Sequence, residues 1–155
     1  MRTVYKVLAY LIAVEVAVQA TAVVYAMYGL GKWVDGGGVL DKAVMESGET
    51  SFPGAVGFAV HGMNGMMIIP LIALSMLIVS FFTKVRGAVK WAGLVLLLVA
   101  VQVSLGMFGH DVPALGALHG LNALLLFGTA VYAGHRARAV PRGAERPEAP
   151  VATPV

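Results

Sequence analysis

Residues 59–69 read AVHGMNGMMII and residues 117–127 read ALHGLNALLLF, so a histidine, the glycine after it and a nearby asparagine occur twice at the same spacing. Each copy lies within a long apolar run. An ionisable ring inside hydrocarbon marks a functional site by default, and two rings in the same local setting indicate one site built by two helices. The repeated residues are His61, Gly62 and Asn64 in the first copy and His119, Gly120 and Asn122 in the second.

The composition is that of a protein embedded in a lipid bilayer. Of the 155 residues, 59% are apolar and 12% are charged, whereas roughly a quarter of the residues of a soluble domain are charged. Because the chain has no cysteine, it has no disulfide, no thiolate metal site and no cysteine nucleophile. Any metal chemistry must therefore use histidines or carboxylates. The apolar run at residues 4–30 is longer than the core of a signal peptide, so we expect it to remain as a membrane span.

The apolar runs predict an all-α fold with four transmembrane helices, since about 20 residues cross the hydrocarbon core. Pro53 suits the first turn of the second helix, and Pro70 is expected to kink that helix in its middle. A glycine-rich outer loop at residues 31–52 can hold a short interfacial helix at 39–45. The predicted spans are residues 4–30, 53–82, 89–109 and 113–134, within a domain of residues 1–138 that is followed by a disordered tail at 139–155.

Basic residues flank the spans on one side of the predicted membrane. They precede the first span, fill the short connection between the second and third, and follow the fourth. By the positive-inside rule both termini are then cytoplasmic, in what we expect to be the plasma membrane of a bacterium. This placement suits an anionic membrane surface and not nucleic-acid binding. The flanking cations are Arg2, Lys6, Lys84, Arg86, Lys90, Arg136 and Arg138.

A second repeat accompanies the first. Residues 99–102 of the third span read VAVQ, as do residues 16–19 of the first. VAVQ consists mostly of common membrane residues, whereas histidine and asparagine are disfavoured in hydrocarbon, so the histidine repeat carries more weight. Together they predict an up-down-up-down four-helix bundle made by tandem duplication of a helical hairpin, with a pseudo-twofold axis along the membrane normal.

The histidines are expected to lie at similar depth. From the ends of their helices, the rise per residue puts His61 about 12 Å and His119 about 9 Å below the outer surface. Gln19 and Gln102 fall in or near the same layer. In such a bundle the second and fourth helices are diagonal, and their inward side chains meet across the core, where bundles build cofactor sites.

Two opposed imidazoles suit a haem better than a small metal ion. A small site usually needs three or four protein ligands, whereas a haem iron needs only two axial ones. Small residues around both rings leave room for a flat macrocycle, and each ring can use its other nitrogen to hydrogen-bond a carbonyl, Asn or Gln. We therefore expect haem b, with His61 and His119 as iron ligands. The other predicted binding residues are Gln19, Gly57, Gly62, Asn64, Gly65, Gln102, Gly116, Gly120 and Asn122.

Other interpretations stay open at this point. Asn and His in a membrane helix can simply bond a neighbouring helix, for about 0.6–2 kcal/mol, as in a haem-free accessory subunit of a larger respiratory complex. Glu15, the only acidic residue in a span, shares a helical face with Gln19; it can make an interhelical contact, handle protons in a transport path or bind a quinone. Lys32 and Lys42 are simple solvated charges or cations near an outward-facing ligand. His110 and His135 fit interfacial positions.

The glutamine late in each odd helix and the segment LHGLNALLLF at residues 118–127 resemble one four-helix half of haem A synthase, and small four-helix bacterial membrane proteins. In haem A synthase each half has a histidine on its second and fourth helices, and one half holds a b-type haem. The resemblance implies His61 and His119 as the axial pair. The catalytic half of that family has a glutamate three positions before a haem-binding histidine, where this chain has Phe58 and Gly116. It is therefore more similar to the half that only holds haem, which implies electron transfer with a quinone or a respiratory-chain partner.

Overall fold

The computed structural model describes residues 1–47, 52–109 and 111–138. These residues form helices and connections, with no strand among them. Four of the described helical segments are long and apolar enough to cross a membrane, which indicates a membrane protein. The elements are α1 (Arg2–Asp35), α2 (Lys42–Ser47), α3 (Val56–Met63), the π-helix η1 (Asn64–Ile68), α4 (Ile69–Ser80), α5 (Ala88–Phe108) and α6 (Pro113–Arg136). The predicted disordered tail lies outside the described residues.

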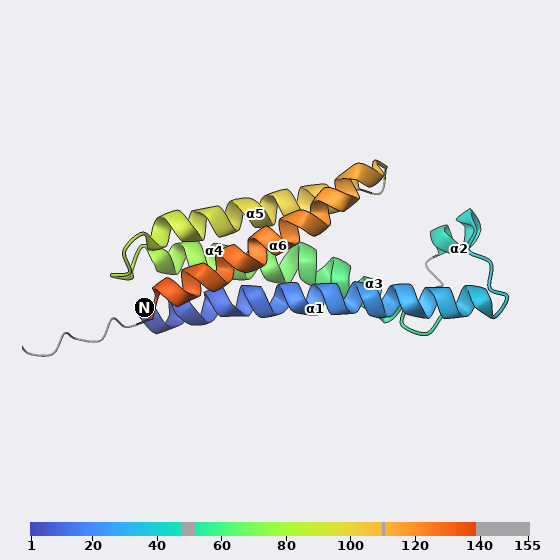
Figure 1. Cartoon of the computed structure of the whole chain (residues 1–155), viewed down its shortest axis with the longest axis horizontal. Helices are drawn as coiled ribbons and strands as arrows, with labels where there is room; N and C mark the ends of the chain where they lie inside the picture. The colour runs from blue at the N-terminus through green and yellow to red at the C-terminus, as the bar shows by residue number, and fades with distance from the viewer. Residues whose placement is uncertain (48–51, 110, 139–155) are drawn as a thin grey trace, which may run out of the picture.

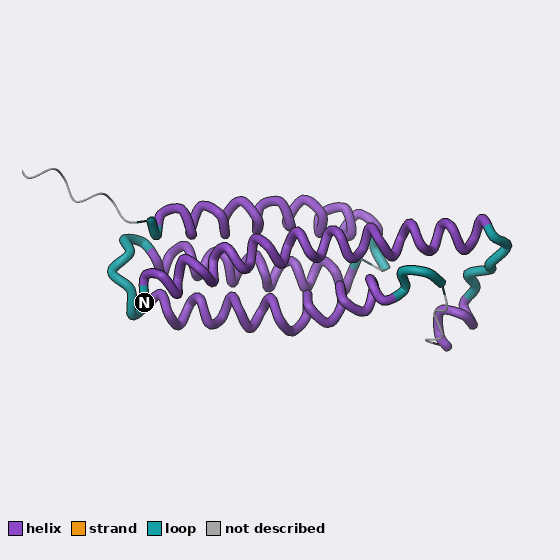
Figure 2. The backbone as a smooth tube through the Cα atoms, turned by 90° about the horizontal axis from the view of Figure 1, so that it is seen from below, coloured by secondary structure: helices purple, strands orange, loops and turns teal. Residues whose placement is uncertain are grey.

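The first helix is longer than the predicted span at residues 4–30. No proline follows Leu30, so α1 continues to Asp35 and stops at a run of glycines, where Gly37 has a left-handed backbone with φ +95°. Its last turns run past the ends of α5 and α6 (Figures 1 and 2). We call this end, where α2 lies, the outer end of the bundle, and the end with the N-terminus the inner end.

The long helices form a ring of four neighbours. α4 packs against α1 and α5, and α6 packs against the same two helices, so α4 and α6 occupy opposite corners. The chain begins and α6 finishes at the inner end, where Arg2 Nε donates to the carbonyl oxygen of Ala137 (2.8 Å) and Arg2 Nη2 to that of Arg138. The arginine thereby satisfies carbonyls that the helix itself leaves without partners.

The close-packed core fills only the inner part of the bundle. Small residues dominate it, which lets the helix backbones approach closely, as is common in membranes. Tyr5 has the largest side chain of this core, and its hydroxyl donates to the carbonyl oxygen of Ala88 at the start of α5 (3.2 Å). The core residues are Tyr5, Ala9, Ile12 and Ala13 of α1, Ile69, Ala73 and Met76 of α4, Ala88, Ala92, Val95 and Val99 of α5, and Leu126, Ala130 and Ala133 of α6, with Ala137 just beyond it.

The second span, Val56–Ser80, changes its helical geometry near its middle. Pro70 has no N–H and its ring crowds the carbonyl one turn earlier, and the helix widens to the π form directly before it, where the Ile69 N–H donates to the carbonyl of Asn64. The expected kink at Pro70 stays a prediction, and the feature observed beside the proline is this π-helical turn. Pro53 does not begin the helix as expected. It lies in a turn before Val56, in which Gly54 has φ +94°.

Two glycines let the outer part of the second span lie directly on α1. A Cβ added at Gly57 of α3 would lie 2.3 Å from the carbonyl oxygen of Ala22, and one at Gly29 of α1 would lie 1.6 Å from the carbonyl oxygen of Pro53. Neither backbone oxygen can move aside cheaply. The contact between α1 and α3 therefore depends on the absence of side chains at these positions.

Substituting Gly57 by alanine is expected to lower the stability of the folded protein in detergent by about 1–3 kcal/mol, because the added methyl overpacks the α1–α3 contact. The matched control is Gly128→Ala on α6, where a Cβ meets nothing within 4 Å. That change should raise stability by up to about 0.5–1 kcal/mol through helix propensity. Thermal unfolding followed by circular dichroism measures both, and equal midpoints for the two variants would contradict the packing described here.

Candidate functional site

The two repeated histidines face each other in the outer half of the bundle. His61 comes from α3 and His119 from α6, and the centroids of their rings are 6.0 Å apart with the ring planes tilted by 58°. Both side chains are partly buried. The structure thus brings together the two side chains that the sequence singled out, from different helical hairpins.

Each ring is held by the helix that precedes it in its own hairpin. His61 Nδ1 lies 3.3 Å from the backbone carbonyl oxygen of Gln19, and His119 Nδ1 lies 3.0 Å from that of Gln102. A carbonyl only accepts, so the Gln102 contact favours a proton on Nδ1 of His119. Neither Nε2 has a hydrogen-bond partner among the described residues, and on His119 this tautomer leaves the Nε2 lone pair available to a ligand.

A polar network supports the second ring. The side-chain amide of Asn122 donates to Gln102 Oε1 (2.6 Å) and to the carbonyl oxygen of Leu98 (3.0 Å). Asn122 is buried, so both of its N–H groups find acceptors inside the protein, as buried polar groups must. This network ties α6 to α5 one turn beyond the histidine.

A related network supports the first ring. Asn64 Nδ2 donates to Glu15 Oε2 (2.7 Å). With its amide oriented to satisfy its neighbours, Gln19 accepts from Asn64 Nδ2 (3.0 Å) and from the N–H of Gly65 (3.1 Å). Its amide nitrogen then donates to the carbonyl oxygen of His61 (2.9 Å) and to His61 Nδ1 (2.7 Å), so in this orientation Nδ1 of His61 accepts and the ring proton is on Nε2.

The histidines line a cavity of about 640 Å³ between the two hairpins, within the usual 300–1,000 Å³ of small-molecule and cofactor sites. It begins where the close-packed core ends, since Val99, Leu126 and Ile69 belong to both. Its walls are mostly apolar. The lining residues are Val16, Ala17, Gln19, Ala20 and Val23 of α1; His61, Gly62, Gly65, Met66 and Ile69 of the second span; Val99, Gln102, Val103, Gly106 and Met107 of α5; and His119, Gly120, Ala123, Leu124, Leu126 and Phe127 of α6.

Most of these residues occupy matching positions of the two repeats. When the VAVQ segments are aligned with each other and the histidine segments likewise, the wall of one hairpin corresponds to the wall of the other. Both walls supply a glutamine, a histidine and a glycine directly after the histidine. The matching pairs are Val16/Val99, Gln19/Gln102, Ala20/Val103, Val23/Gly106, His61/His119, Gly62/Gly120, Gly65/Ala123, Met66/Leu124 and Ile69/Phe127.

Not every predicted site residue lies at the cavity. Gly62, Gly65 and Gly120 line it, but Gly57 and Gly116 do not. Gly57 packs on α1 instead, and Gly116 lies at the close contact with Gly109 between α5 and α6, where a Cβ on Gly109 would be 3.0 Å from the Gly116 Cα. Both glycines serve helix packing. Asn64 and Asn122 lie behind the wall and hydrogen-bond the residues that form it.

Gly106 is a site residue that the sequence interpretation missed. A Cβ there would lie 3.1 Å from His119 Cε1 and 3.2 Å from its Nδ1, closer than most real contacts of this kind, so the glycine makes room for the imidazole. The available signal was its position one helical turn after Gln102, on the same face of α5. It was overlooked because glycine is common in membrane helices.

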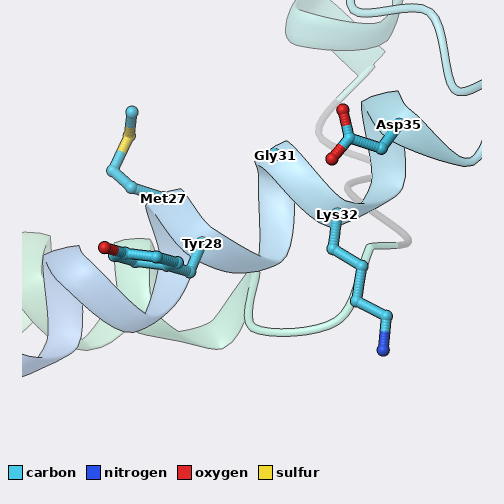
Figure 3. A pocket seen from close by; sticks show the side chains of 5 residues that line it. All are labelled: Met27, Tyr28, Gly31, Lys32 and Asp35. Carbon is cyan, nitrogen blue, oxygen red and sulfur yellow. The ribbon is translucent and has the colours of Figure 1, made fainter.

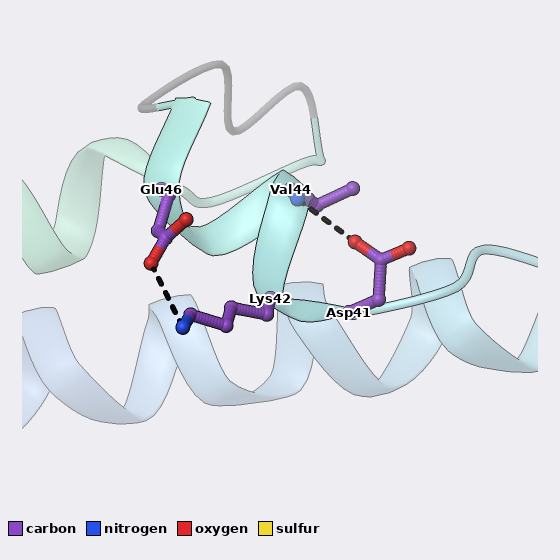
Figure 4. A network of polar contacts seen from close by, with 4 residues as sticks. All are labelled: Asp41, Lys42, Val44 and Glu46. Carbon is purple, nitrogen blue, oxygen red and sulfur yellow. Dashed lines mark hydrogen bonds and ion pairs between the residues drawn. The ribbon is translucent and has the colours of Figure 1, made fainter.

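The remaining candidates lie away from this cavity. Lys32 lines a shallow depression near the end of α1 with Met27, Tyr28, Gly31 and Asp35 (Figure 3). Lys42 pairs with Glu46 across one turn of α2 (3.5 Å), an exposed pair of little energetic weight (Figure 4). At the start of the same helix Asp41 accepts from the N–H of Val44 (2.9 Å) as an N-cap.

His135 is exposed in the last turn of α6, and His110 lies outside the described residues. Among residues 1–47, 52–109 and 111–138 there is no group of three or more histidine, aspartate or glutamate side chains that could hold a metal ion. The histidine pair therefore offers two protein ligands.

The chain was compared with protein-family models, with curated proteins and with solved structures, and no match was found in any of the three.

The Glu15–Asn64 bond yields a test of the polar layer. Glu15→Gln keeps an acceptor oxygen, so its stability in detergent should stay within about 0.5 kcal/mol of the native protein. Glu15→Leu deprives Asn64 of a partner and should cost about 0.6–2 kcal/mol, the range for interhelical bonds in membranes. A double-mutant cycle with Asn64→Leu, followed by thermal unfolding, isolates the pairwise energy. Strictly additive losses would mean that the two side chains do not interact.

Proposed function

We propose that this protein holds one b-type haem between His61 and His119 and uses it for electron transfer. The separation of the two rings carries the proposal. Bonds from a metal to an imidazole nitrogen are about 2.0–2.1 Å long, so two rings on opposite sides of one ion have centroids about 6.3 Å apart. The observed separation is 6.0 Å. Other ring pairs of the chain pack at 6.0 and 6.1 Å without a shared ligand, so the support comes from this separation together with the cavity that both histidines line.

The space around the rings supports the same ligand. A Cβ added at Gly62 or at Gly120 would meet nothing within 4 Å, so the helices are bare where the cavity adjoins them. Because each of these glycines follows a histidine, a flat macrocycle can reach the imidazole without meeting a side chain. The wall of the cavity is mostly apolar, as a haem macrocycle requires.

The chain's own groups would fix the ligands. The carbonyl oxygen of Gln102 accepts from Nδ1–H of His119, which selects the tautomer with a lone pair on Nε2 and raises the basicity of that nitrogen. In His61 the same tautomer requires the Gln19 side-chain amide to present its oxygen, and not its N–H, to Nδ1. A haem held by His61 and His119 would supply one-electron transfer. A quinone or a respiratory-chain partner would supply and receive the electrons.

We further infer that the bundle arose by tandem duplication of a hairpin with up-down-up-down topology. The matched cavity walls, the equivalent His–Gln contacts and the two sequence repeats support this origin. The basic residues at the inner end support cytoplasmic termini in a bacterial plasma membrane. The likeness to haem A synthase extends to the histidine pair but not to its catalytic glutamate, because Phe58 and Gly116 stand at those positions. We therefore propose that the protein holds haem but does not synthesise haem A.

Purified after expression with haem supply, the protein should show a Soret band that sharpens and shifts on reduction, and a pyridine haemochrome spectrum of haem b. His61→Ala and His119→Ala should each lose most of the bound haem, because one imidazole cannot complete a six-coordinate iron. Absorbance per mole of protein measures the loss.

A pair of glycine variants distinguishes haem loss caused by filling the cavity from haem loss caused by a less stable fold. Gly120→Leu fills the bare wall and should reduce haem content with both ligands in place. Gly128→Leu adds the same side chain on an exposed face of α6 and should not. A colourless, stably folded native protein would instead favour the haem-free accessory subunit, in which Asn64, Asn122 and their partners only bond helices together.

A further inference from the structure

The described carboxylates and cations are distributed unequally between the two ends of the bundle. Apart from Glu15, within a span, the described carboxylates belong to the outer half of the molecule. The inner end carries seven cations and no described carboxylate. The sequence beyond Arg138 contains two arginines and two glutamates, whose formal charges cancel. The described carboxylates are Glu15, Asp35, Asp41, Glu46 and Asp111, and the inner cations are Arg2, Lys6, Lys84, Arg86, Lys90, Arg136 and Arg138.

Two of these cations lie on an aromatic pair that joins α5 to α6. Trp91 and Tyr132 meet edge to face with ring centroids 4.6 Å apart. Lys90 Nζ lies 5.9 Å from the centre of the Trp91 ring, and Arg136 Cζ lies 5.7 Å from that of Tyr132. The cluster of Lys90, Trp91, Tyr132 and Arg136 thus presents a positive charge at each end of an aromatic platform, within the terminal turns of two membrane helices.

We propose that this cluster, at the inner end of α5 and α6, is a binding site for the headgroup of an anionic phospholipid. Neither Lys90 nor Arg136 has a carboxylate within 4 Å among the described residues. Arg136 Nη1 donates to the Tyr132 hydroxyl (3.2 Å), which leaves the phenolic proton free to be donated outward. An ammonium, a guanidinium and a hydroxyl together provide the donors that a phosphodiester accepts.

The position of the cluster favours a lipid over a soluble anion. Tryptophan and tyrosine at the end of a membrane helix lie at headgroup level, and Tyr132 is 43% exposed on the lipid-facing side of the helix pair. A headgroup held there keeps its acyl chains beside the apolar faces of α5 and α6. Basic pockets between membrane helices bind anionic headgroups by this arrangement.

Other inner cations are used differently, which provides a matched control. Arg2 already donates to the carbonyl oxygens of Ala137 and Arg138. Lys84 and Arg86 lie in the connection between α4 and α5, and neither contacts an aromatic ring. Removing these two changes the net charge by the same amount as removing Lys90 and Arg136 but leaves the aromatic platform as it is.

The test uses Trp91 as its own probe. The chain has two tryptophans, so Trp33→Phe at the outer end leaves Trp91 as the sole emitter. This protein is reconstituted in vesicles of phosphatidylcholine with increasing fractions of brominated phosphatidylglycerol or of brominated phosphatidylcholine. We expect quenching by the anionic lipid to saturate with at least about fivefold preference over the zwitterionic lipid, since one basic side chain in direct contact with the bound headgroup contributes about that factor.

Two pairs of variants distinguish binding of the anionic lipid at this cluster from a general attraction to all the cations of the inner end. In the pair Lys90→Gln with Arg136→Gln the preference should fall to within about twofold, while Lys84→Gln with Arg86→Gln should keep it. An unchanged helical circular dichroism spectrum shows that each variant is folded. Equal loss in both pairs, or no preference in the native sequence, would overturn the proposal.

A competition separates the lipid from a free anion. Inorganic phosphate, exchanged for chloride at constant ionic strength, should leave the quenching unchanged, because the acyl chains hold the headgroup at the membrane surface. Reversal by phosphate would mean that the cluster takes a soluble anion, and would refute the lipid assignment. None of these measurements requires haem, so their outcome is independent of the proposed electron-transfer function.

Discussion

The hydrogen bonds from the two histidine rings to the backbone of the preceding helix are the contacts on which the site depends. A histidine within hydrocarbon must find partners inside the protein, because no water is available to it. Here one ring nitrogen faces a glutamine carbonyl in each hairpin, at 3.3 and 3.0 Å. The contact holds each ring against the preceding helix, at the wall of the cavity that both histidines line.

The cavity exists because the bundle is packed unevenly along its length. Alanine and other small residues bring the four helices together at the inner end, with buried side chains such as Ala73 and Ala130. Beyond Val99 and Leu126 that close packing gives way to a space lined by glycine and larger apolar side chains. Dispersion forces hold membrane helices together where they interdigitate, and these contacts are lost around a cavity. The close packing and the cavity therefore occupy different halves of one small domain.

The two halves of the bundle are similar but not equivalent. Asn122 donates to Gln102 and to the backbone of Leu98, while Asn64 donates to Gln19 and to the carboxyl group of Glu15. Glu15 and Leu98 are the residues directly before the two VAVQ segments, so the same donor reaches the same position in each half. A side-chain carboxyl group replaces a backbone carbonyl in the first half, next to the π-helix that precedes Pro70. The first half thus departs from the second at two adjoining features of the polar layer.

The sequence by itself determined the four apolar helices, the repeated histidines and the glutamines that accompany them, because these follow from hydropathy and from residues disfavoured in hydrocarbon. It did not determine which glycines border the cavity. Gly57 and Gly62 look alike in the sequence, yet one lies against the backbone of α1 and the other borders open space. Only the tertiary structure decided this, as it decided the role of Gly106, the partner of Glu15 and the extent of α1. The physical reason is that hydropathy reports the medium around a helix, whereas the face that meets another helix is set by how the backbones cross.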